Sequence, residues 1–120
     1  MNTQNLPLLA FGAAVEEASG MSLEEAFWND QDDRPVPVKM SRWTVVPGGR
    51  SPVDQHSVRE CWMIASGTGT LRYRDREDVP VRAGDVLYFD SQQSHELIND
   101  STEPISVFSI WWPAENAPGT

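Results

Sequence analysis

Short apolar segments separated by turn residues recur from residue 38 to residue 112. Each is rich in β-branched and aromatic residues, a composition typical of β-strands. Seven short strands at this spacing predict a sandwich or a barrel. The segments are VKMSRWTVV (38–46), ECWMIAS (60–66), TLRYR (70–74), VPVR (79–82), DVLYF (85–89), SHELIN (94–99) and ISVFSIWW (105–112).

Two of these strands, CWMIA at 61–65 and VLYF at 86–89, are apolar on both alternating faces. Both faces of such strands are expected to be covered. The cover is expected to come from the N-terminal residues or from a second copy of the chain. Because closed two-fold pairs are the commonest assembly, we expect a homodimer.

The first 36 residues carry the only helical signals. Ser22 and Glu25 have the spacing of a capping box and precede an apolar run, which predicts a short helix at about 22–29. Pro35 and Pro37 cannot continue it. The chain is therefore divided into an N-terminal arm with a short helix (1–36), a β-domain (37–113) and a flexible tail (114–120).

Composition narrows the classes of partner. The 120 residues are enough for one domain, and 18 acidic residues against 9 basic ones give a net charge of −9. This charge argues against nucleic acid and membrane surfaces as partners. The single cysteine, Cys61, cannot form an internal disulfide, and Glu16 and Glu17 interrupt the region where a signal peptide is uncharged. We expect a cytoplasmic protein.

Residues 54–62 contain a row of polar side chains of the types that bind metal ions. On an extended strand Asp54, His56, Glu60 and Trp62 share one face. Buried carboxylates are costly without a partner, and a divalent cation would satisfy all three polar groups. The alternative is an exposed loop with solvated side chains. The only other histidine of the chain is His95.

The spacing of this row resembles the first motif of the cupin family. Residues of the types expected recur at the family's intervals, with an aspartate in place of the first histidine: Gly48, Asp54, His56, Glu60 and Gly67.

A second stretch resembles the second cupin motif. It keeps every interval but has aspartate and glutamine in place of the usual proline and glycine: Gly84, Asp90, Gln92, His95 and Asn99. The resemblance covers about residues 38–112 and implies an all-β, double-sheet jelly-roll barrel open at one end.

The resemblance also implies one divalent metal ion per chain, held by His56, Glu60 and His95. Asp54 either completes this ligand set, holds a water molecule instead, or marks a site that has lost its metal. Two histidines and a carboxylate suit Fe(II), our first choice, and mixed nitrogen and oxygen ligation also admits Mn, Zn or Ni.

Such a site implies an enzyme acting on a small oxygenated metabolite, with Fe(II)-type, dioxygenase-like oxidation preferred. Whichever of Glu60 and Asp54 is not tightly bound to the metal would then serve as general base. Alternatives are an isomerase or epimerase (with or without metal), a lyase, a cyclase, or a non-catalytic binding module. In the metal-free epimerase a histidine is the base and a tyrosine the acid. The side chains expected to line the pocket are Trp62, Tyr73, Tyr88 and Leu97.

Overall fold

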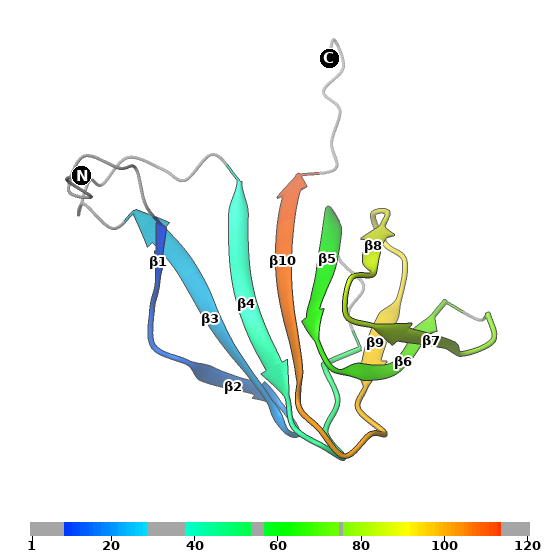
Figure 1. The fold of residues 1–120 in the computed structure, drawn as a ribbon. Helices are drawn as coiled ribbons and strands as arrows, with labels where there is room; N and C mark the ends of the chain where they lie inside the picture. Colours follow the sequence, from blue (N-terminus) through cyan, green and yellow to red (C-terminus); the bar gives the residue numbers. More distant parts are fainter. Residues whose placement is uncertain (1–8, 29–37, 54–56, 75, 114–120) are drawn as a thin grey trace, which may run out of the picture.

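The computed structural model describes residues 9–28, 38–53, 57–74 and 76–113, and these form ten β-strands (Figure 1). These residues include no helix, and so none long and apolar enough to cross a membrane. The strands are β1 (Leu9–Phe11), β2 (Val15–Ala18), β3 (Met21–Trp28), β4 (Lys39–Val45), β5 (Val58–Ser66), β6 (Thr68–Tyr73), β7 (Val79–Arg82), β8 (Val86–Phe89), β9 (His95–Ile98) and β10 (Ile105–Pro113).

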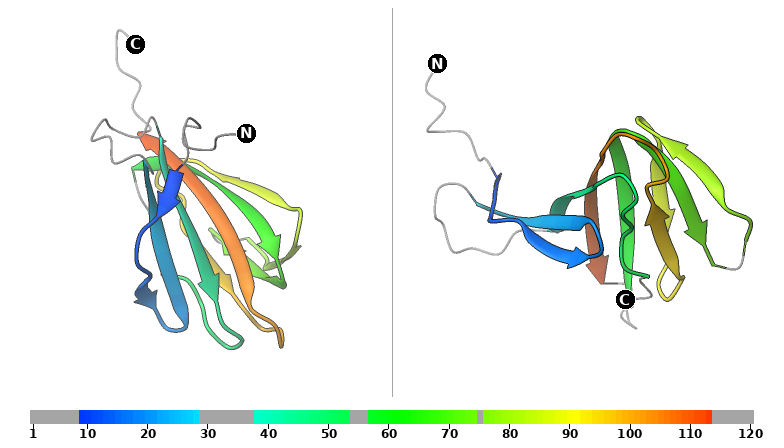
Figure 2. Two further views of the ribbon diagram at one scale, coloured as in Figure 1. Left: turned by 60° about the vertical axis from the view of Figure 1, so that its left-hand side comes forward. Right: turned by 90° about the horizontal axis from the view of Figure 1, so that it is seen from below.

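The predicted all-β class and all seven predicted strands are confirmed, as strands β4 to β10. They form two antiparallel sheets. The longer sheet has the order β1-β3-β4-β10-β5-β8, with β2 paired to β3, and the shorter one has the order β7-β6-β9. Figure 2 shows the two sheets curving around a common interior, the jelly-roll arrangement that the motif resemblance implies.

The core lies between the two sheets and is built by alternating residues. Along β10 the buried positions are Ile105, Val107 and Ser109, and along β4 they are Ser41, Trp43 and Val45. Since side chains on a strand alternate between faces, these sets point inward. The buried apolar residues of the core are Met21, Trp43, Val45, Trp62, Ile64, Leu71, Val81, Phe89, Leu97, Ile105 and Val107.

The helix predicted at about 22–29 is wrong, because residues 21–28 form strand β3. Met21 and Leu23 lie opposite Val45 and Trp43 of β4 and pack with the core. The ion pair between Glu24 and its cross-strand partner Arg42 spans 2.6 Å. A capping pattern stabilises a helix by only about 1 kcal/mol, whereas pairing on both edges of β3 buries apolar side chains.

The N-terminal strands extend the long sheet at one edge (Figure 1), and Val86 and Tyr88 on β8 stay 66% and 51% exposed. The apolar outer face of β8 is therefore not covered by the described part of the N-terminal segment. The homodimer stays a prediction, and residues 114–120, predicted to be a flexible tail, lie outside the described residues.

Gly67 is predicted to be irreplaceable for steric reasons. It has a φ of +89°, and a Cβ there would lie 2.4 Å from the carbonyl oxygen of Pro104. Gly84 is the matched control, since its φ is +96° but a Cβ there meets no atom within 4 Å. We expect Gly84→Ala to lose about 1 kcal/mol of unfolding free energy and Gly67→Ala about 3 kcal/mol or more. Urea denaturation measures both, and equal losses would contradict the packing argument.

Candidate active site

A cavity of about 990 Å³ opens on the inner face of the long sheet, between the N-terminal strands and strands β4, β5 and β10. Its walls are mainly apolar and aromatic, and its polar side chains are serines and glutamates. The larger apolar residues that line it are Met21, Leu23, Phe27, Trp43, Trp62 and Trp111.

Glu60 and His95, two of the predicted metal ligands, are brought together across the barrel. Glu60 lines the cavity from β5, and His95 begins β9 in the shorter sheet. Their side chains meet with His95 Nε2 at 3.2 Å from Glu60 Oε1. His95 is only 2% exposed, so the pair lies where water is largely excluded.

The tautomer of His95 is set by the hydrogen bond that its ring nitrogen Nδ1 makes. Nδ1 lies 2.8 Å from the backbone carbonyl oxygen of Gln93. A carbonyl only accepts hydrogen bonds, so Nδ1 carries the hydrogen. This leaves Nε2, on the Glu60 side, to present a lone pair in the neutral ring or to donate in the charged ring.

The imidazole is also held in place by aromatic rings. Phe89 stacks on it with ring centroids 4.1 Å apart and an interplanar angle of 9°, and Trp62 meets it edge-on at 5.1 Å. These contacts, with the Nδ1 hydrogen bond, fix the direction in which Nε2 points.

The pair fits the metal chemistry that the motifs imply. Two ligand atoms each about 2.1 Å from one metal ion, at angles of about 90–110°, lie about 3.0–3.4 Å apart, which matches the separation of Glu60 Oε1 and His95 Nε2. The backbone hydrogen bond at Nδ1 is the outer-shell contact that metal-binding histidines usually make. Asp54 and His56 lie outside the described residues, among which no group of three His, Cys, Asp or Glu side chains is placed to hold a metal.

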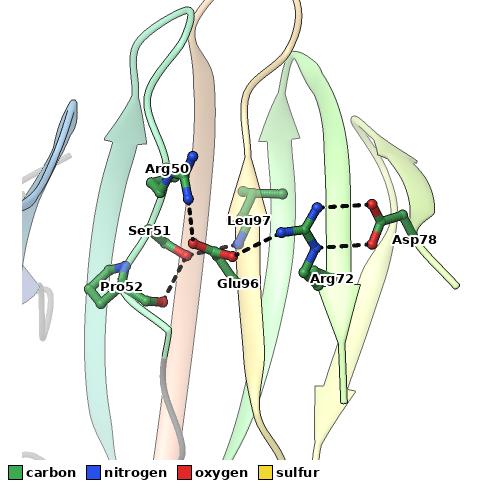
Figure 3. Close-up of polar contacts among 7 residues, drawn as sticks. All are labelled: Arg50, Ser51, Pro52, Arg72, Asp78, Glu96 and Leu97. Carbon is green, nitrogen blue, oxygen red and sulfur yellow. Dashed lines mark hydrogen bonds and ion pairs between the residues drawn. The ribbon is translucent and has the colours of Figure 1, made fainter. Parts of the chain in front are cut away.

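The segment that leads toward Asp54 and His56 is tied to β9. Ser51 N donates to Leu97 O at 2.9 Å, and Leu97 N donates to Ser51 Oγ at 2.8 Å (Figure 3). One step further back, Asn99 N donates to Gly49 O, and Gly48 N donates to Asn99 O. This ladder fixes residues 48–51 along the strand that begins with His95.

Glu96 reinforces this junction from the other face of β9. Its side chain is almost fully buried and accepts a hydrogen bond from Arg50 at 3.4 Å, while Arg72 lies 3.9 Å away (Figure 3). Arg72 also donates two hydrogen bonds of 3.2 Å to Asp78, and they lower the pKa of that carboxyl. Because both arginines are about half exposed, these ion pairs contribute modestly to stability.

One of the four residues predicted to line the pocket lies at the cavity. Trp62 lines the cavity, but Tyr73, Tyr88 and Leu97 are not among its described lining residues. Leu97 is fully buried in the core, and Tyr73 Oη donates to Gln93 Oε1.

Tyr88 faces outward on β8. Its hydroxyl donates to Asp90 Oδ1 at 2.7 Å, a hydrogen bond that raises the pKa of the phenol. Tyr73, in contrast, is the direct cross-strand neighbour of His95 on β6.

Two serines that were not predicted as site residues, Ser41 and Ser109, lie side by side in the cavity wall. The signal was the alternation along 38–46 and 105–112, which puts both serines on the same inward face as Trp43 and Val107.

The family model of the cupin domain matches residues 41–111. The plu4264 protein from Photorhabdus luminescens is similar in structure, at 23% identity and a TM-score of 0.70, over 83% of this chain and 80% of that one. A cupin 2 conserved barrel domain protein from Salinispora arenicola shares 24% identity at a TM-score of 0.68, over 82% and 81%. A predicted oxalate decarboxylase from Thermotoga maritima shares 22% at 0.67, over 84% and 90%.

The ladder between residues 48–51 and β9 gives a prediction for Ser51. Ser51→Ala leaves the Leu97 N–H without its acceptor in a buried position, which costs about 1–3 kcal/mol of unfolding free energy. Ser57→Ala is the control, since Ser57 belongs to the same connection but is exposed, and we expect a change within about 0.5 kcal/mol. Chemical denaturation of both variants measures the difference. A Ser51→Ala variant as stable as Ser57→Ala would contradict the role given to this hydrogen bond.

Proposed function

The chain belongs to the cupin family, whose members commonly bind a divalent metal, and on this premise we propose that it is a metal-dependent enzyme acting on a small oxygenated metabolite. The observation that carries the proposal is the contact of His95 with Glu60, which lines a cavity large enough for a substrate. A carboxylate and an imidazole held together beside a largely apolar cavity are the first two ligands that such a centre needs.

The residues that would hold the metal are Glu60 and His95, with His56 and Asp54 completing the set. A bound divalent metal supplies Lewis acidity, polarising a substrate oxygen, and Fe(II) adds the capacity for oxidation. Phe89 and Trp62 keep the His95 ring from turning, and the Gln93 carbonyl keeps its Nδ1 protonated. Glu60 lines the cavity, so a Glu60 carboxylate oxygen that does not bind the metal is placed to take a proton from a bound substrate.

Oxidative chemistry with Fe(II) is our first choice of reaction class. Structures that share the fold are described as a predicted oxalate decarboxylase and as the polyketide cyclase RemF from Streptomyces resistomycificus. At 22% and 17% identity they support the fold alone, and one fold carries several chemistries. Oxygen consumption on substrate addition separates oxidation from lyase, isomerase and cyclase reactions.

The test of the proposal is the metal content of protein purified without chelator or nickel affinity resin. We expect about one equivalent of a divalent transition metal per chain, and at least about tenfold weaker metal affinity in Glu60→Gln, since a ligand is lost. Glu25→Gln is the matched control, because Glu25 also lines the cavity but belongs to β3.

Equal metal affinity in Glu60→Gln and Glu25→Gln would overturn the assignment of Glu60 as a ligand. Failure of the wild-type protein to take up added Fe(II), Mn(II), Ni(II) or Zn(II) would overturn the metal-dependent enzyme. The Glu60–His95 pair would then be read as a proton-transfer pair in a metal-free isomerase, which its 3.2 Å contact also favours.

A further inference from the structure

The outer face of the long sheet carries a continuous apolar surface across β4, β10, β5 and β8, which lie side by side (Figure 1). On each of these strands, the side chains that alternate with the buried ones point away from the interior. Strand pairing sets these outward side chains in rows that cross all four strands. Two adjacent rows, which we call the outer patch, are Met40, Ile110, Cys61 and Tyr88, and Arg42, Phe108, Met63 and Val86.

The outer patch is open to solvent in the single chain, most of all at β8. Val86 and Tyr88 are 66% and 51% exposed, and the ring of Trp112 stacks on that of Tyr88 with centroids 6.5 Å apart, which extends the apolar surface along β10. Toward the N-terminal strands, Phe11 of β1 packs against Phe108 with ring centroids 6.2 Å apart. Contiguous apolar patches that cross several strands of a sheet often mark a contact with another molecule.

The residue types of the outer patch are those that protein interfaces favour. Aromatic residues, methionine and arginine are enriched at interfaces, whereas lysine, acidic residues, serine and alanine are depleted. The patch has two aromatic residues, two methionines and one arginine, and none of the depleted types. The flexible thioethers of Met40 and Met63 also adapt readily to the shape of a facing surface. The patch therefore has the chemistry of a contact between proteins.

The charges around the patch favour a second copy of this chain as the partner. Arg42 pairs with Glu24 at 2.6 Å, and Arg59 pairs with Asp90 at 3.2 Å, so the patch and its borders are neutral. The chain as a whole carries a net charge of −9, so its entire acidic excess lies elsewhere. Two copies of so acidic a chain repel one another unless they meet over a neutral surface, whereas a basic partner is attracted to the acidic surface instead.

We propose that two copies of the chain pack their outer patches face to face as a two-fold dimer. The same residues then meet from both sides, and the exposed side chains of Val86 and Tyr88 are covered. This assigns a surface to the homodimer expected from the apolar character of both faces of β5 and β8. The cavity lies on the inner face of the same sheet, so the dimer leaves it open to a ligand, and the inference does not rest on the proposed function.

The test compares two valine substitutions that add the same charge. Val86 is the first residue of β8 and belongs to the patch, whereas Val79 is the first residue of β7 in the shorter sheet and is 44% exposed. By light scattering, the wild-type chain should show twice the 13.4 kDa mass of one copy. Val86→Glu places a carboxylate from each copy in the interface and should weaken dimerisation at least about tenfold, while Val79→Glu should change it less than about twofold.

A readout on the wild-type chain keeps the test independent of how well the variants fold. Cys61 is the only cysteine of the chain and lies in the patch between Ile110 and Tyr88, so its rate of reaction with a thiol reagent reports whether the patch is covered. We expect this rate to rise several-fold when the protein is diluted from about 100 µM to about 1 µM, because dilution dissociates the dimer.

Three results would each overturn the proposal. The first is a wild-type chain that stays monomeric at about 100 µM, the concentration at which a micromolar dimer is nearly complete. The second is equal dimerisation of Val86→Glu and Val79→Glu, which would place the contact on another surface. The third is labelling of Cys61 at the same rate in monomer and dimer.

Discussion

The structure depends on the antiparallel pairing of residues 48–51 with Leu97–Asn99, which joins the connection between β4 and β5 to the shorter sheet. Four hydrogen bonds hold it, three between backbone groups and one from Leu97 N to Ser51 Oγ. The same ladder carries both halves of the candidate centre, since His95 lies two residues before Leu97 and the chain continues from Ser51 toward Asp54, His56 and Glu60. A change that loosens this pairing therefore acts on stability and on the site together.

Several residues of the two sequence motifs have structural roles and not chemical ones. The amide of Asn99 donates to the carbonyl oxygens of Val45 and Glu103 and accepts from Ser101, so a fully buried side chain closes the turn before β10. Gly67 lets the turn after β5 approach the backbone at Pro104. Among the motif residues that the structure describes, Glu60 and His95 face one another. The regular spacing of the motifs is therefore required by the turns as much as by the site.

The seven strands were predictable because alternation and turn residues are local signals, and the Glu60–His95 contact was predictable because it follows from motif spacing. The helix failed because pairing with β4 and burial of Met21 outweighed a local capping pattern. Tyr88 and Leu97 were expected at the pocket from residue type and parity, yet parity does not say which parts of a curved interior are filled by core. The serine pair was not predicted because Ser41 and Ser109 meet only when two strands distant in sequence are set side by side.

Two parts of the chain line the cavity, the N-terminal strands and the barrel. Nine of its nineteen described lining residues lie between Gly12 and Phe27, outside the segment matched by the family model, whereas Glu60 and His95 lie inside it. The N-terminal strands contribute Glu17 and Glu25 along with apolar side chains such as Leu23, so they give the wall much of its negative charge. Under the proposed function the reactive pair belongs to the shared barrel, while the N-terminal strands supply about half of the surface that a ligand would meet. Substrate selection by the proposed enzyme would therefore draw on this added edge of the sheet as well as on the shared barrel.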